Sequence, residues 1–202
     1  MSTKYPGYKK CVVDTETTGV DRDKHNVWQI AGSILDNKDN VLESFDFKFQ
    51  PFSFDHIEES AVEKSNIDEK YLRELPMTNA QGYSAFIEVL ERHVNRFDKK
   101  DKMQMIAYNA GFDSDFIRKL FADNGDNYFG SWFWHPPICV MQLAASFLID
   151  VRGAIRDFQL STLCECAGFK WDESKAHDAG YDIDMTLKLY KYLRENTFKL
   201  GE

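Results

Sequence analysis

The chain of 202 residues is 43% apolar and 29% charged, an ordinary composition for a soluble globular protein and enough for one well-buried domain over residues 1–202. Its net charge of −8 and its isoelectric point near 5.2 argue against a protein that coats duplex nucleic acid electrostatically, because such domains are basic. No stretch approaches the ~18–20 uncharged apolar residues that cross a membrane, and residues 1–10 contain no apolar run typical of a signal peptide. The four cysteines are scattered among apolar neighbours, as in a reducing compartment, so we expect a cytoplasmic protein with no membrane partner.

Three strands are predicted at the start of the chain. Apolar runs place them over residues 8–13, 27–35 and 41–49. In the third, phenylalanines alternate with polar residues, which is the period of a half-buried strand. The polar cluster 36–40 between the second and third strands is typical of a hairpin turn, so we expect an antiparallel meander.

Helices and strands alternate in the rest of the chain. The spacing of apolar residues predicts, in chain order, a short helix and turn over 57–67, a helix over 79–97, a strand over 103–108, a helix that begins after 109–111, an irregular aromatic loop over 123–137, a strand over 138–140, and helices over 142–149, 160–167 and 179–194. This order is typical of an α/β sheet with mixed strand directions. In such sheets, sites form where strand ends meet helix starts.

Two carboxylates mark the end of the first strand. Asp14 and Glu16 are two residues apart, so on a strand their side chains face the same way. Side by side they repel, and each raises the pKa of the other unless a cation lies between them. Oxygen ligands of this kind suit Mg²⁺ or Mn²⁺. The alternative is a polar strand end followed by an ordinary turn at Gly19.

Three further residues are candidates for the same site. Asp113 follows a predicted strand at the start of a helix, where it either joins the site or simply stabilises the helix N-terminus. Asp182 lies on the apolar face of the last helix, and a buried carboxylate needs a partner. His177 precedes that helix, either as a solvated loop residue or as a general base beside an activated water. Four carboxylates and a histidine, each at the end of an element, indicate two-metal phosphodiester hydrolysis.

The sequence resembles the DEDDh-type, DnaQ-like 3′–5′ exonucleases. Three segments carry the resemblance in the expected order: 14–19 (DTETTG), 109–116 (NAGFDSDF) and 177–182 (HDAGYD). The histidine five residues before Asp182 indicates the DEDDh type rather than its tyrosine-containing sister group. The family contains the proofreading subunit of the bacterial replicative polymerase and ribonuclease T.

The resemblance implies a fold and a set of residue roles. The fold is ribonuclease-H-like α/β, with a five-stranded mixed sheet in the order 3-2-1-4-5, strand 2 antiparallel, flanked by helices. The cofactors are two divalent ions, Mg²⁺ with Mn²⁺ able to substitute. The implied metal ligands and catalytic residues are Asp14, Glu16, Asp113 and Asp182, with His177 as general base. The implied substrate-binding residues are Thr15, Thr17, Thr18, Asn109 and Phe112.

The expected activity is 3′–5′ hydrolysis of single-stranded nucleic acid, releasing nucleoside 5′-monophosphates. DNA is the first expected substrate, an RNA-trimming exoribonuclease is the alternative, and a non-catalytic nucleic-acid-binding domain is a third interpretation. The aromatic loop 123–137 either stacks on unpaired bases or plugs the domain or a dimer interface. A homodimer is left open, and a polymerase partner is not indicated.

Overall fold

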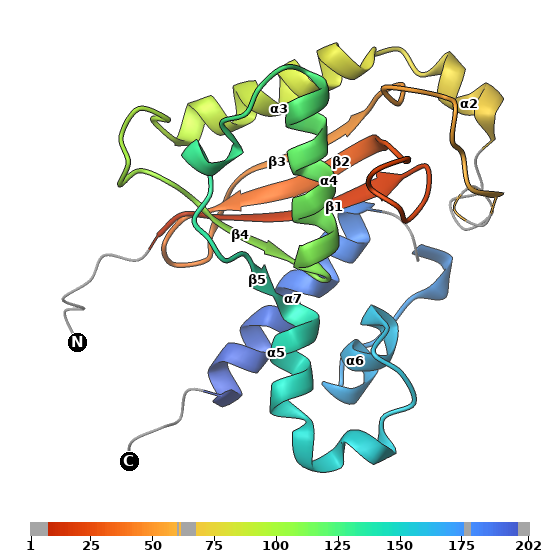
Figure 1. The fold of residues 1–202 in the computed structure, drawn as a ribbon. Helices are drawn as coiled ribbons and strands as arrows, with labels where there is room; N and C mark the ends of the chain where they lie inside the picture. Colours follow the sequence, from red (N-terminus) through yellow and green to blue (C-terminus); the bar gives the residue numbers. More distant parts are fainter. Residues whose placement is uncertain (1–7, 60, 62–67, 176–178, 198–202) are drawn as a thin grey trace.

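The computed structural model describes residues 8–59, 61, 68–175 and 179–197. One five-stranded sheet organises these residues, with the strands in the order β3-β2-β1-β4-β5 (Figure 1). The strands are β1 (Lys10–Thr17), β2 (Val27–Leu35), β3 (Val41–Lys48), β4 (Gln104–Ala107) and β5 (Ile138–Cys139). β2 runs antiparallel to both β1 and β3, whereas β4 runs parallel to β1 and to β5. The predicted ribonuclease-H-like strand order is confirmed.

The helices cover the two faces of the sheet. They are α2 (Glu69–Glu74), α3 (Asn79–His93), α4 (Ala110–Asp123), α5 (Val140–Phe147), α6 (Leu160–Cys166) and α7 (Ala179–Thr197), with short 3₁₀ turns η1 (Phe129–Ser131), η2 (Ile149–Ala154) and η3 (Glu173–Lys175). α3 and α4 lie on one face, and α5, α6 and α7 lie on the other (Figure 1). No helix among the described residues is long and apolar enough to cross a membrane.

Alternation along β1 distributes its side chains between two cores. Cys11 and Val13 belong to the core beneath α3 and α4, whereas Val12 belongs to the core beneath α5, α6 and α7. A strand with both faces covered reads as a continuous apolar run, which is why β2 was recognisable from the sequence. The strand predicted over 8–13 starts at Lys10 and continues to Thr17, because its polar second half also pairs with β2. The carboxylates at 14 and 16 continue the series of Val12, on the α7 side of the sheet.

The helix predicted over 79–97 is shorter than expected. It begins with a capping box in which Thr78 and Gln81 satisfy each other's backbone N–H groups, and it ends at His93. Val94 is extended and its N–H closes the last turn on the carbonyl of Leu90. Phe97, which the spacing had assigned to the helix, lies beyond it and is 89% exposed. Apolar spacing continued past the end of the helix by chance.

Two other sequence predictions meet different outcomes. Within the aromatic loop 123–137, Phe129, Trp132 and Phe133 are buried in the core beneath α3 and α4, so these rings plug the domain and do not form a stacking platform. The short helix and turn predicted over 57–67 includes residues 60 and 62–67, which lie outside the part of the chain that the structure describes.

Candidate active site

β1 supplies the first two carboxylates, Asp14 and Glu16. In the antiparallel register with β2, Asp14 lies opposite Ala31 and Glu16 lies opposite Gln29. Both acids are half-buried. The strand is hydrogen-bonded to β2 along its whole length and to β4 at its start, so it holds the two acids on a fixed backbone.

Asp113 enters the site from the first turn of α4. That helix starts at the end of β4, and its N-cap residue Asn109 makes no capping hydrogen bond with its side chain. Asp113 is buried, and its Oδ1 accepts two hydrogen bonds from Thr15, one from the backbone N–H at 3.0 Å and one from Oγ1 at 2.9 Å. The second helix-borne acid, Asp182, lies in the first turn of α7 and is half-buried.

The four acids lie close enough for their charges to interact. Burial raises the pKa of Asp14 well above its ordinary value, and the charges of Asp113, Glu16 and Asp182 raise it further. Burial likewise raises the pKa of Asp113 to about 7, with Glu16 adding to the rise and the hydrogen bonds from Thr15 opposing it. The structure therefore brings together the four carboxylates that the sequence singled out.

The donor chemistry of this site fits divalent metal ions. All four side chains offer carboxylate oxygens, the ligands preferred by Mg²⁺ and Mn²⁺. A cation among them would offset both the burial and the mutual repulsion that raise these pKa values. Within the described ranges, no three His, Cys, Asp or Glu side chains form a ready-made metal-binding group. The argument that divalent ions fit this site therefore rests on its carboxylate oxygens and on the interaction between the charges of the four acids.

The predicted substrate-binding residues fall into two sets. Thr17 and Thr18 are buried: Thr17 Oγ1 donates to the carbonyl of Gly19 at 2.7 Å, and Thr18 Oγ1 donates to the carbonyl of His56 at 3.1 Å. Thr15 is also buried, with both of its donors directed to Asp113. In contrast, Asn109 is exposed and Phe112 is half-buried. The second set is therefore the more accessible to a substrate.

His177 lies outside the described residues, which resume at Ala179. The segment before it is fastened to α7, because Asp172 donates its N–H to Tyr181 Oη at 2.8 Å and Trp171 packs edge-on against the Tyr181 ring. The role of His177 as general base stays a prediction from the sequence.

Two contacts of the site were missed by the sequence interpretation. The first is the link from Thr15 to Asp113. The second is His25, whose ring stands so close to Gly19 that a Cβ there would come within 2.5 Å of it, and whose Nδ1 accepts the N–H of Asp21 at 2.9 Å. Neither contact could be predicted from the sequence pattern. The first depends on how α4 packs against β1, and the second depends on how the loop after β1 folds back.

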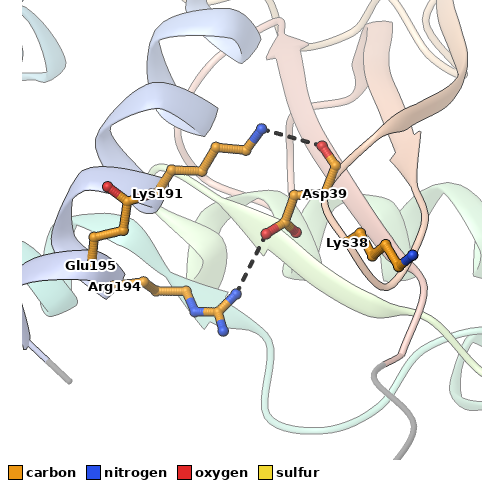
Figure 2. Close-up of a pocket in the computed structure, with 5 residues that line it drawn as sticks. All are labelled: Lys38, Asp39, Lys191, Arg194 and Glu195. Atoms are coloured by element: carbon orange, nitrogen blue, oxygen red, sulfur yellow. Dashed lines mark hydrogen bonds and ion pairs between the residues drawn. The ribbon is translucent and has the colours of Figure 1, made fainter. Parts of the chain in front are cut away.

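A pocket at the other end of β1 has a different character (Figure 2). Figure 2 shows Lys191 and Arg194 of α7 directed toward Asp39, in the turn between β2 and β3. Lys191 donates to the Asp39 carbonyl at 3.2 Å, Arg194 Nη1 lies 3.6 Å from its carboxylate, and Lys10 Nζ lies 2.6 Å from it. The carboxylate is matched by cations, so this cluster fastens the hairpin to α7.

A ribonuclease-H-like sheet with four interacting carboxylates at its centre defines a nuclease-type site. Residues 11–190 match the family model RNase T, described as an exonuclease, and the chain therefore belongs to this family. It is a 3′–5′ exonuclease, and the family generally uses two divalent metal ions.

Similar proteins agree with the assignment. The chain is 28% identical to ribonuclease T of Shewanella frigidimarina, with 93% of this chain and 82% of the relative covered, and 28% identical to ribonuclease T of Yersinia enterocolitica, with 100% and 91% covered. Among solved structures it is similar to Escherichia coli exonuclease I in complex with a dT13 oligonucleotide, with a TM-score of 0.73, 21% identity, and coverage of 93% of this chain and 41% of exonuclease I. The chain thus spans about two fifths of exonuclease I, and this likeness concerns the fold.

Proposed function

We propose that the chain shortens single strands from the 3′ end and releases nucleoside 5′-monophosphates, with residues 1–202 acting as one cytoplasmic exonuclease domain. The observation that carries the proposal is the meeting of four carboxylates from three elements: Asp14 and Glu16 on β1, Asp113 in the first turn of α4 and hydrogen-bonded to β1, and Asp182 in the first turn of α7. Buried like charges destabilise a fold, so their presence at the centre of the sheet indicates a site selected for chemistry.

The proposed roles follow the placement of the acids. Asp14, Glu16 and Asp182 hold one divalent ion, and Asp113 serves the second; Mg²⁺ is the proposed metal, with Mn²⁺ able to substitute. When bound, the two ions supply Lewis acidity, which lowers the pKa of the attacking water and stabilises charge on the leaving oxygen. His177 takes the proton of that water. Asn109 and Phe112 contact the terminal nucleotide, whereas the hydroxyls of Thr15, Thr17 and Thr18 donate to protein acceptors, so these threonines support the site through contacts within the protein.

RNA is the substrate that we now place first. The relatives that match nearly the whole chain are named ribonuclease T, whereas the sequence alone had favoured DNA. DNA remains the second candidate, because the fold is shared with exonuclease I solved with DNA oligonucleotides. Single strands are proposed in both cases, since a terminal base must be unpaired to enter the site. A homodimer is part of neither proposal.

Matched 5′-labelled RNA and DNA oligomers test the proposal. Incubation with Mg²⁺ should give a ladder that shortens from the 3′ end, faster for RNA than for DNA, and an Asp14→Ala variant should give none. Faster shortening of DNA would reverse the choice of sugar and leave the reaction standing. No shortening of either oligomer, with Mn²⁺ also tried, would favour the non-catalytic nucleic-acid-binding interpretation.

A further inference from the structure

Thr15 forms the most direct link between β1 and α4 at the site. Its N–H and its Oγ1 donate to the same oxygen, Oδ1 of Asp113, at 3.0 and 2.9 Å, across 98 positions of sequence. Both residues are buried, Thr15 at 7% and Asp113 at 4% exposure. Hydrogen bonds in a buried place are strong and directional, so two that end on the same oxygen fix the orientation of the carboxyl group.

The strand geometry explains why Thr15 makes this link. Asp14 and Glu16 point to the α7 side of the sheet, and Thr15, between them, continues the series of Cys11 and Val13 on the α4 side. α4 packs on that side through Phe116 and Ile117. Thr15 is therefore the residue of the acidic segment that can reach the first turn of α4 with its side chain.

We propose that Thr15 is a positioning residue, which holds Asp113 so that its carboxylate meets a divalent ion together with the acids of β1. The inference rests on the proposed two-metal function and assigns to Thr15 a task other than substrate contact. Because both hydrogen bonds end on Oδ1, Thr15 does not engage Oδ2. A side chain that orients a metal ligand in this way is already in place before the metal binds. Its loss weakens metal binding, although the ligand itself remains.

A purely structural role makes a different prediction. If Thr15 served only to satisfy a buried carboxylate, its hydroxyl would matter for stability and not for metal affinity. The chain offers a matched control, Thr17, which is also buried on β1 and donates its Oγ1 to the carbonyl of Gly19 at 2.7 Å, with no carboxylate involved. Thr→Val at either position removes one buried hydroxyl and keeps the β-branched shape.

The test measures Mn²⁺ binding to the full chain by electron paramagnetic resonance or calorimetry, and the Tm of each variant in EDTA. Thr15→Val should weaken the binding of one of the two ions by about tenfold, the lower end for loss of a residue that orients a metal ligand. Thr15→Ser, which retains the hydroxyl, should bind Mn²⁺ as the wild type does, and so should Thr17→Val. In EDTA, the Tm of both Thr15→Val and Thr17→Val should fall, because each loses a buried hydrogen bond, so a loss of Mn²⁺ affinity confined to Thr15→Val is not a consequence of lower stability.

Each contrary result has a defined meaning. Wild-type Mn²⁺ affinity in Thr15→Val would overturn the inference and leave the proposed function intact. An equal loss of affinity in Thr17→Val would also overturn it, because the loss would then follow any damage to the strand. Failure of the wild-type chain to bind Mn²⁺ would overturn the proposed function itself, and the inference with it.

Discussion

Two aspartates near opposite ends of β1 have opposite electrostatic surroundings. Asp39 lies beside the start of the strand, where its carboxylate lies 2.6 Å from Lys10 Nζ. Arg194 Nη1 lies 3.6 Å from the same carboxylate (Figure 2). Asp14 lies further along the strand, where burial raises its pKa and the charges of three other acids raise it further. Among the described residues, no Lys, Arg or His forms an ion pair with Asp14 or Asp113.

The difference separates a structural carboxylate from a functional one. At Asp39, attraction joins a hairpin to α7, and the charges serve stability. At Asp14, burial and like charges oppose folding, and the proposed divalent ions would offset both effects. The same substitution at the two positions should therefore have opposite consequences.

The largest expected effect is that of Asp14→Asn on catalysis. Loss of a proposed metal ligand at the centre of the site should reduce the rate of 3′ shortening by at least about 100-fold. In EDTA at neutral pH, however, the variant should have a higher Tm than the wild type, because Asn removes a buried charge that its neighbours repel. Gel-based assays and thermal unfolding provide the two measurements.

A combined loss of activity and of Tm in Asp14→Asn would contradict the comparison, since it would make Asp14 a structural residue. Circular dichroism on the same samples establishes that the variant is folded.

The second prediction concerns Asp39→Asn, the matched variant. Asn tolerates the positive φ of 66° at this turn, so the change removes charge without backbone strain. Loss of the charged contacts should lower the free energy of unfolding by about 2 kcal/mol and the Tm by roughly 4–8 °C. The rate of 3′ shortening, measured below the Tm, should be unchanged. A stability equal to that of the wild type would show that the cations around Asp39 contribute nothing.

The smallest effect is expected at Glu43, which like Asp39 has cations as partners. Arg92 and His93, at the end of α3, lower the pKa of Glu43 from 4.5 to about 2. A lowered pKa gives stability that is present above pH 4.5 and is lost as the pH falls toward 2. Glu43→Gln should therefore cost about 1 kcal/mol at pH 6, allowing for solvent screening. The difference from wild type should vanish near pH 2 in denaturant titrations; a constant difference across this range would exclude the ion pairs as its source.

The fold was largely predictable because its strands leave strong local patterns. The strand expected over 27–35 coincides with β2, since a strand buried along its length reads as an apolar run. The β3 phenylalanines alternate as predicted, with Phe45 buried. The end of α3 was not predictable, because the apolar spacing continued to Phe97 while the backbone had become extended at Val94.

The acids of the candidate site were predictable from the sequence, but the residues that hydrogen-bond to them were not. Asp14 and Glu16 follow from strand periodicity, and Asp113 and Asp182 from their places at helix starts. The contact between Thr15 and Asp113 joins residues 98 positions apart and depends on how α4 packs against the sheet, which no local pattern records. For the same reason, the sequence suggested substrate binding for Thr15 and gave no sign that its two donors are directed to Asp113.

The central place of β1 in the sheet has a consequence for how the site is assembled. The strand is paired with β2 along its whole length and with β4 at its start, so the ladder with β2 fixes the spacing of its two carboxylates as the sheet forms. The free energy of folding therefore offsets the repulsion between these carboxylates, and the binding of an oligonucleotide does not have to offset it. The acids are therefore preorganised, and the binding energy of the other nucleotides of the substrate can serve to hold the terminal phosphodiester in line for attack.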